Sequence, residues 1–103
     1  MKTKKLQNFL EENGFKVYLI EQDGVQCAEI EKWTYGGVDM NIFLNPFTIE
    51  EFKNYVNDFN IDEEIELCRQ DQSYKNNFTI SQSLKDFTYF HNQLKEITNH
   101  YNQ

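Results

Sequence analysis

Apolar residues near the start of the chain repeat with the spacing of an amphipathic helix. Leu6, Phe9 and Leu10 would lie on one side of this helix, with charged and polar residues on its other sides. Asn13 and Gly14 follow, and both tolerate the left-handed backbone conformation that ends many helices. The pattern predicts a short helix that ends at this Asn-Gly pair.

Two segments with alternating apolar residues flank Asp23-Gly24. Aspartate followed by glycine is a frequent two-residue hairpin turn, because both positions of a type I′ turn need a positive φ angle. A turn of this length fixes the pairing of the strands and makes one face of the hairpin apolar. The expected pairs are Lys16 with Glu31, Val17 with Ile30, Tyr18 with Glu29, Leu19 with Ala28, Ile20 with Cys27 and Gln22 with Val25.

A third strand is expected after the loop sequence WTYGG. From Val38 to Leu44, apolar residues alternate with others at the period of a strand. With Lys32 opposite Val38, the apolar face of the hairpin continues across this strand. The expected pairs are Ile30 with Met40 and Ala28 with Ile42 on that face, and Glu31 with Asp39, Glu29 with Asn41 and Cys27 with Phe43 on the other.

Two further helices are expected to begin at capping sequences. In PFTIEEF, Thr48 is the expected N-cap and Glu51 its capping-box partner. In FTISQ, Thr79 and Gln82 have the same relation. The expected buried residues are Ile49, Phe52, Val56 and Phe59 in the first helix, and Leu84, Phe87, His91, Leu94 and Tyr101 in the second.

The segment IDEEIELCR, between these helices, fits two patterns. Ile61, Ile65 and Cys68 have helical spacing. In a strand, Ile61, Ile65 and Leu67 would instead lie on one side and the acidic residues on the other. The strand pattern is the more complete, so we expect a fourth strand here. The acidic side of that strand would consist of Asp62, Glu64 and Glu66, spaced by roughly 6.8 Å.

These elements predict a single acidic α+β domain over residues 1–103, in the order α-β-β-β-α-β-α. Three amphipathic helices would cover one face of an antiparallel-rich four-stranded sheet, which gives a two-layer fold. Nine Phe, six Tyr and one Trp supply the large side chains that its core needs.

The net charge of −7 and the shortage of arginine narrow the range of partners. Nucleic acid and anionic membranes attract basic proteins, whereas nine of the ten cations here are Lys and only Arg69 is Arg. The first residues carry positive charge but no apolar run follows, so neither a signal peptide nor a membrane span is expected. We expect a cytoplasmic protein that binds neither nucleic acid nor membrane directly.

No sequence pattern indicates catalysis, a metal site or a cofactor. Cys27 and Cys68 are isolated and are expected to be reduced, buried residues. His91 lies in the apolar stripe of the last helix, and His100 would point elsewhere. A glycosidase needs two carboxyl groups in different environments, and nothing distinguishes one acid of this row from the others. The loop pattern of a calcium site is also absent. We therefore expect a protein that is not an enzyme.

The sheet face turned away from the helices is expected to bind a partner. Aromatic and acidic side chains are interleaved on it, which is unusual for a face that contacts only water. The expected acidic contacts are Asp62, Glu64, Glu66, Glu29, Glu31 and Asp39, and the expected aromatic contacts are Tyr18, Trp33 and Phe43.

This combination favours a module that binds the basic surface of a nucleic-acid-handling protein. Acidic rows with aromatic anchors complement a groove that normally holds DNA or RNA, so the chain would act as a nucleic-acid mimic. Its size and charge resemble those of small inhibitors from phages and mobile elements, including anti-CRISPR and anti-restriction proteins. The alternatives are ordinary solvation of the acids, a homodimer through the same face, and a small-ligand-sensing domain with a pocket near His91.

Overall fold

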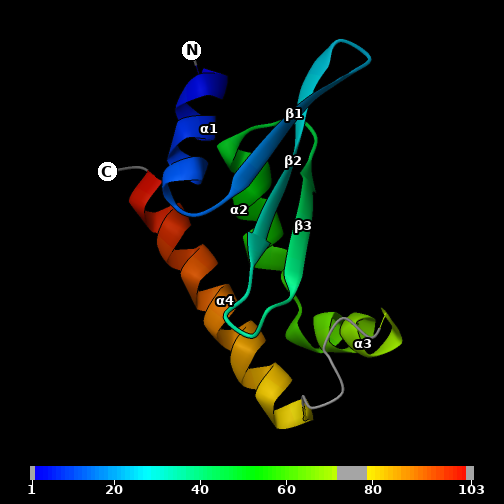
Figure 1. Ribbon diagram of the computed structural model, residues 1–103. Helices are drawn as coiled ribbons and strands as arrows, with labels where there is room; N and C mark the ends of the chain where they lie inside the picture. Colours follow the sequence, from blue (N-terminus) through cyan, green and yellow to red (C-terminus); the bar gives the residue numbers. More distant parts are fainter. Residues whose placement is uncertain (1, 72–78, 102–103) are drawn as a thin grey trace.

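A computed structural model of the chain describes residues 2–71 and 79–101 (Figure 1). These residues form four helices and one three-stranded antiparallel sheet with the order β1-β2-β3. The predicted four-stranded sheet with three helices is therefore wrong. None of the described helices is long and apolar enough to cross a membrane. The elements are α1 (Lys2–Glu12), β1 (Lys16–Gln22), β2 (Val25–Trp33), β3 (Asp39–Leu44), α2 (Ile49–Asp58), α3 (Ile61–Asp71) and α4 (Ile80–Tyr101).

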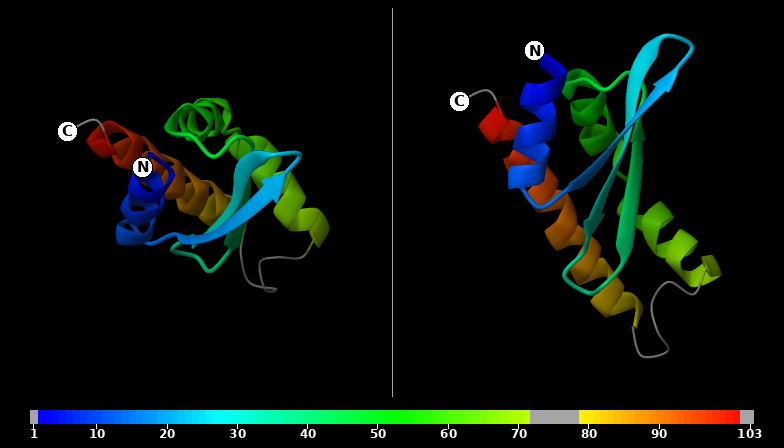
Figure 2. Two further views of the ribbon diagram at one scale, coloured as in Figure 1. Left: turned by 90° about the horizontal axis from the view of Figure 1, so that it is seen from above. Right: turned by 45° about the horizontal axis from the view of Figure 1, so that its top comes forward.

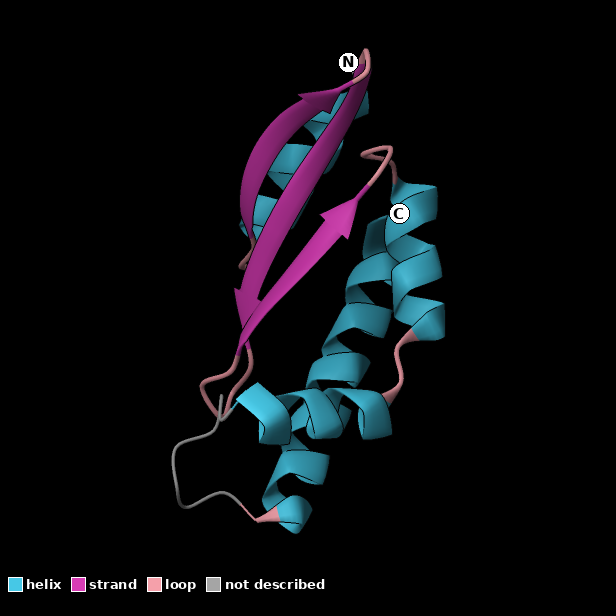
Figure 3. Cartoon of the chain, turned by 90° about the vertical axis from the view of Figure 1, so that its right-hand side faces the viewer, coloured by secondary structure: helices cyan, strands magenta, loops and turns pink. Residues whose placement is uncertain are grey.

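The helices leave one face of the sheet uncovered. α2 and α4 pack behind the sheet, α1 lies on the β1 side, and α3 lies on the β3 side (Figure 2). Seen from the β3 side, α2 and α4 lie to one side of the strands, and the opposite face of the sheet is open (Figure 3). We call this open face the outer face. The sequence predicted such an arrangement for a larger sheet.

The end of α1 has the geometry that the Asn-Gly pair predicted. The Phe15 N–H donates to the Leu10 carbonyl at 3.0 Å, and the Gly14 N–H donates to the Glu11 carbonyl at 3.2 Å. These two bonds form a Schellman motif, in which Gly14 has a φ angle of 92°. The Lys32 amine also donates to the Asn13 carbonyl at 3.1 Å, which joins the end of α1 to β2.

The register between β1 and β2 is confirmed at every predicted pair. β3, however, pairs with β2 two residues away from its predicted position, so that Ile30 faces Ile42 and not Met40. Because side chains alternate with a period of two, this shift keeps each residue on its predicted face but changes its neighbours. The observed pairs are Ala28 with Leu44, Glu29 with Phe43, Ile30 with Ile42, Glu31 with Asn41, Lys32 with Met40 and Trp33 with Asp39.

The shift follows from a β2–β3 turn that is bound to α4. The Thr34 N–H donates to the Val38 carbonyl at 2.8 Å, so the pairing of the strands continues past Trp33. The buried carboxylate of Asp86 on α4 accepts hydrogen bonds from the Thr34 hydroxyl and the Gly36 N–H, both at 2.7 Å. No local sequence pattern indicated these contacts, since the bonded residues are 50 or more positions apart.

The predicted capping box is confirmed in full at the N-terminus of α4 and only in part at that of α2. The Thr48 hydroxyl accepts a hydrogen bond from the Glu51 N–H at 3.2 Å, but the Thr48 N–H donates to the Pro46 carbonyl. At α4 both bonds of the capping box form. The Gln82 N–H donates to the Thr79 hydroxyl at 3.1 Å, and the Thr79 N–H donates to the Gln82 side chain at 2.8 Å.

Residues 61–71 form a helix, so the predicted fourth strand is wrong. The Asn60 side chain accepts a hydrogen bond from the Glu63 N–H at 3.1 Å, which makes Asn60 the N-cap of α3. Three carboxylates in the first turn also favour a helix here, because they interact well with the positive end of the helix dipole. The strand interpretation gave no weight to this cap. The apolar side of α3 consists of Ile61, Ile65 and Cys68.

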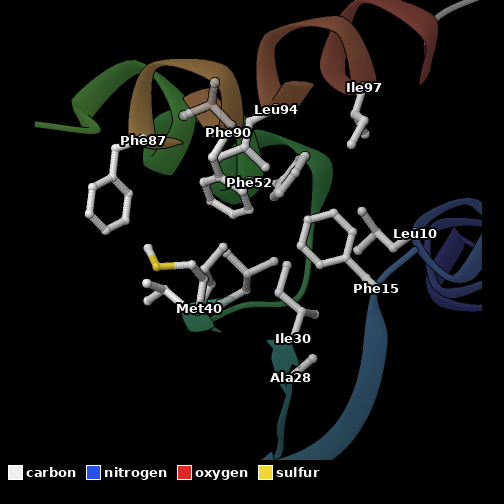
Figure 4. Packing of buried hydrophobic residues seen from close by; sticks show 14 of the residues in the cluster. Leu10, Phe15, Ala28, Ile30, Met40, Phe52, Phe87, Phe90, Leu94 and Ile97 are labelled. Atoms are coloured by element: carbon white, nitrogen blue, oxygen red, sulfur yellow. The ribbon is translucent and has the colours of Figure 1, made fainter. Parts of the chain in front are cut away.

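The core lies between the inner face of the sheet and the helices (Figure 4). Phe52 of α2 and Phe87 of α4 are fully buried, as their spacing predicted. Two predictions for α4 need correction. Phe90 is fully buried although it was not predicted, whereas Leu84 is 46% exposed. The helix turns a slightly different side to the sheet than the predicted stripe, and that side includes the polar residue Asp86.

We expect that replacing Asp86 with alanine destabilises the fold. The change removes two hydrogen bonds to a buried carboxylate and leaves the Gly36 N–H without its acceptor. The free energy of unfolding should fall by about 3 kcal/mol, measured by urea denaturation. Thr88→Ala, at an exposed position of the same helix, should change it by less than about 0.5 kcal/mol. Equal stability of the Asp86→Ala variant and the wild type would contradict this role.

Candidate protein-binding surface

The outer face carries rows of side chains that run across the strands. Residues directly opposite each other in neighbouring strands share a face and lie side by side. Each of the central rows therefore combines residues from all three strands. The rows are Tyr18, Glu29 and Phe43; Lys16, Glu31 and Asn41; and Trp33 with Asp39.

The aromatic residues of the outer face are largely in contact with solvent. Tyr18 is 52% exposed, Trp33 57% and Phe43 50%. An apolar surface of this kind on a sheet is typical of a binding interface. Glu29 lies between Tyr18 and Phe43 and is itself exposed. A partner side chain that contacts this carboxylate would therefore also meet an aromatic ring on either side.

Glu31 and Asp39 interact with each other on this face. A hydrogen bond with Asp39 raises the pKa of Glu31, and desolvation and the negative charge of Asp39 act in the same direction. Lys16, opposite Glu31 on β1, lowers this pKa, and Glu29 raises it. One cation does not balance the three acids, so the outer face is negative around its aromatic residues.

The three acids of the predicted fourth strand do not form a row. Asp62 and Glu66 are one helical turn apart on α3 and both are exposed. Glu64 points to another side of the helix and is half-buried. The continuous acidic strand that we expected is therefore replaced by two separate groups. Six of the nine predicted contact residues lie together on the outer face, namely Tyr18, Trp33, Phe43, Glu29, Glu31 and Asp39.

Glu64 lines a pocket that sequence reasoning missed. The pocket has a volume of about 330 Å³ and lies where β3, α2 and α3 meet. Burial raises the pKa of Glu64, and the charge of Glu63 adds to this shift. The pKa of Tyr55 is also raised, by burial first and by Glu64 second. No sequence pattern could reveal the pocket, because three elements have to meet to form it. Its lining comprises Val38, Asp39, Met40, Asn41, Tyr55, Glu64, Leu67 and Cys68.

His91 and the cysteines take part in packing. The His91 Nε2 atom lies 2.8 Å from the Val56 carbonyl oxygen, and its ring centroid lies 4.8 Å from that of Phe59. His91 does not line the pocket described above. Cys27 and Cys68 are free and buried. Within residues 2–71 and 79–101, no three His, Cys, Asp or Glu side chains are grouped as in a metal site.

We expect the acid pair on the outer face to make stability depend on pH. The folded pKa of Glu31 is raised, so the folded protein binds a proton at pH values where the unfolded chain has released it. The contribution of Glu31 to stability should therefore increase as pH falls from neutral through its folded pKa. Asp39→Asn should lower the pKa of Glu31, measured by carbon NMR of its carboxyl group.

The remote substitution Glu12→Gln, at an exposed position of α1, serves as the control and should leave the Glu31 titration unchanged. An Asp39→Asn variant in which Glu31 titrates as in the wild type would show that the two carboxyl groups do not interact.

No match to this chain was found among models of known protein families, curated proteins or solved structures. The proposal for its function therefore depends on the physical character of the surface described above.

Proposed function

We propose that this chain is a non-enzymatic binding module that docks through the outer face of its sheet onto a basic surface of another protein. One observation carries the proposal. Three exposed aromatic side chains and three carboxylates are interleaved on a sheet face that no described helix covers. This face therefore offers apolar contact and negative charge in the same area.

The aromatic residues would supply most of the affinity. Tyrosine and tryptophan are frequent among the residues that dominate binding energy, and burial of apolar area contributes roughly 25 cal/mol per Å². Carboxylates between them would attract a basic surface from a distance and fix its orientation. Trp33 lies at the end of β2 and Phe43 lies on the edge strand β3. The contact with the partner would extend to these two residues.

A groove that normally holds nucleic acid is the partner surface that fits this pattern. Such grooves present cations to phosphates and flat side chains to bases. The outer face offers carboxylates in place of phosphates and aromatic rings in place of bases. Glu29 and Glu31, two positions apart on β2, are roughly 6.8 Å from each other along the strand. The partner would be a nucleic-acid-handling protein, and the mode of action would be competition with its DNA or RNA.

Self-association through the outer face is less well supported. Two copies packed face to face would bring Glu29, Glu31 and Asp39 towards the same acids of the second copy, with Lys16 as the cation of each face. Burial of carboxylates without matched cations is costly. Sedimentation of the purified chain across a range of concentrations measures this alternative directly.

The proposal predicts which variant loses its partner. The triple variant Glu29→Lys, Glu31→Lys and Asp39→Lys should no longer retain a nucleic-acid-handling protein that wild type captures from bacterial lysate at low salt. High salt should weaken capture by wild type, since it screens charge. The matched control is the triple variant Glu12→Lys, Asp58→Lys and Glu96→Lys, which makes the same change in net charge at exposed helix positions.

Two results would support the proposal together. The control variant should retain the partner as wild type does, and added nucleic acid of the kind that the partner binds should displace the chain. Trp33→Ala should weaken the isolated complex by about tenfold or more, measured by calorimetry. If the outer-face variant captures the same partner with unchanged affinity, the docking surface has been assigned to the wrong face.

A further inference from the structure

β3 is one of the two edge strands of the sheet, and one side of its backbone is unpaired. The Thr34 N–H bonds to the Val38 carbonyl, and the Phe47 N–H bonds to the Gln26 carbonyl. Even-numbered positions of β2 therefore direct their backbone groups towards β3, and their partners on β3 direct theirs towards β2. The alternate residues of β3 point their N–H and C=O groups away from the sheet. These residues are Asp39, Asn41 and Phe43.

Nothing in residues 2–71 or 79–101 pairs with this edge as a strand does. The one hydrogen bond on it is weak and local, from the Asn41 side chain to the Asp39 carbonyl at 3.5 Å. A row of free backbone groups of this kind can pair with an extended segment of another chain. In the described part of the chain, no further strand therefore covers the β3 edge of the sheet.

The pocket beneath α3 opens at one end of this edge. The first half of β3 forms one wall of the pocket, and Tyr55, Glu64 and Leu67 form another. Met40 and Leu67 give the pocket an apolar part, whereas the Glu64 carboxylate gives it a negative one. In the described part of the chain, no cation pairs with Glu64. A half-buried carboxylate in this position would be stabilised by a cation that enters the pocket.

We propose that the free edge of β3 and the adjacent pocket bind an extended segment of a partner protein that carries a lysine or an arginine. The segment would pair with the backbone of Asn41 and Phe43 as a fourth strand. One of its alternate side chains would enter the pocket, with its aliphatic part against Met40 and Leu67 and its charged end at Glu64. The site adjoins the outer face, and both include the side chains of Asp39 and Asn41. Glu64, Tyr55 and Leu67 belong to the pocket alone.

A second copy of this chain does not fit the site as well. Pairing of two β3 edges would offer the sequence DMNIFL to the pocket, and this segment contains no lysine or arginine. The excess of acidic residues in each copy would also oppose the contact. A basic segment from a different protein satisfies both the charge of the pocket and the free backbone.

The test uses a phage-displayed library of random linear peptides, selected on the wild-type chain and depleted on the Glu64→Lys variant. We expect the retained peptides to contain a lysine or arginine between β-branched residues. With a synthetic peptide of this kind, the NMR amide signals of Asn41 and Phe43 should shift. Glu64→Gln should weaken its binding by about tenfold, the usual scale for loss of a charged contact in a partly buried site.

Two controls separate strand pairing and the pocket charge from general attraction. Methylation of alternate peptide nitrogens should abolish binding, since it removes the donors that pair with β3. Glu63→Gln, which removes a neighbouring exposed carboxylate, should leave the affinity within about twofold of wild type. Unchanged binding after Glu64→Gln or after N-methylation would overturn the proposal.

Glu64 separates this test from the capture experiment, because Glu64 lines the pocket and is not part of the outer face. Selected peptides that lose affinity for the Glu29→Lys variant but not for the Glu64→Gln variant would support the outer face and overturn the β3 site. Selection of no basic peptide would also overturn the β3 site. Conversely, peptides that bind at β3 while the outer-face variant keeps its lysate partner would leave the β3 site standing and refute the proposed function.

Discussion

The arrangement of the sheet depends on one buried carboxylate, that of Asp86. It binds the Thr34 hydroxyl and the Gly36 N–H and so joins the β2–β3 turn to the longest helix. The Thr34 hydroxyl in turn accepts a hydrogen bond from the Val38 N–H at 3.0 Å, at the base of the turn. Hydrogen bonds to a buried charge are strong, and losing one partner leaves the others unsatisfied. The network thereby fixes where β3 begins.

The start of β3 decides which side chains are neighbours on the outer face. In the predicted register, Glu29 would face Asn41; in the observed one it lies between Tyr18 and Phe43. The proposed contact of a partner cation with a carboxylate and two aromatic rings exists only in the observed register. Asp86 does not touch this face, yet it positions the residues that we propose to bind the partner.

Residues 61–71 form a helix and not the predicted strand, and this also affects which surfaces can bind a partner. A fourth strand would have covered an edge of the sheet, beside either the first or the third strand. α3 instead lies to the side of β3 and leaves the β3 edge free. The helix also brings Glu64 against Tyr55 and into the pocket beside β3. Partial burial of this carboxylate is what makes a cationic partner segment a good fit.

The sequence alone determined the features that depend on neighbours in the chain. The Asn-Gly pair ends α1, Asp23-Gly24 fixes the β1–β2 register, and Thr79 caps α4, because a turn or cap involves only a few adjacent residues. The aromatic and acidic character of the outer face was also predictable from the alternation along the strands. The helix at residues 61–71 also has local causes, the Asn60 cap and the carboxylates of its first turn, which the strand prediction overlooked. Tertiary structure decided the β3 register and the pocket. Each depends on contacts between distant segments, of which the bond between Asp86 and Thr34 is the clearest case.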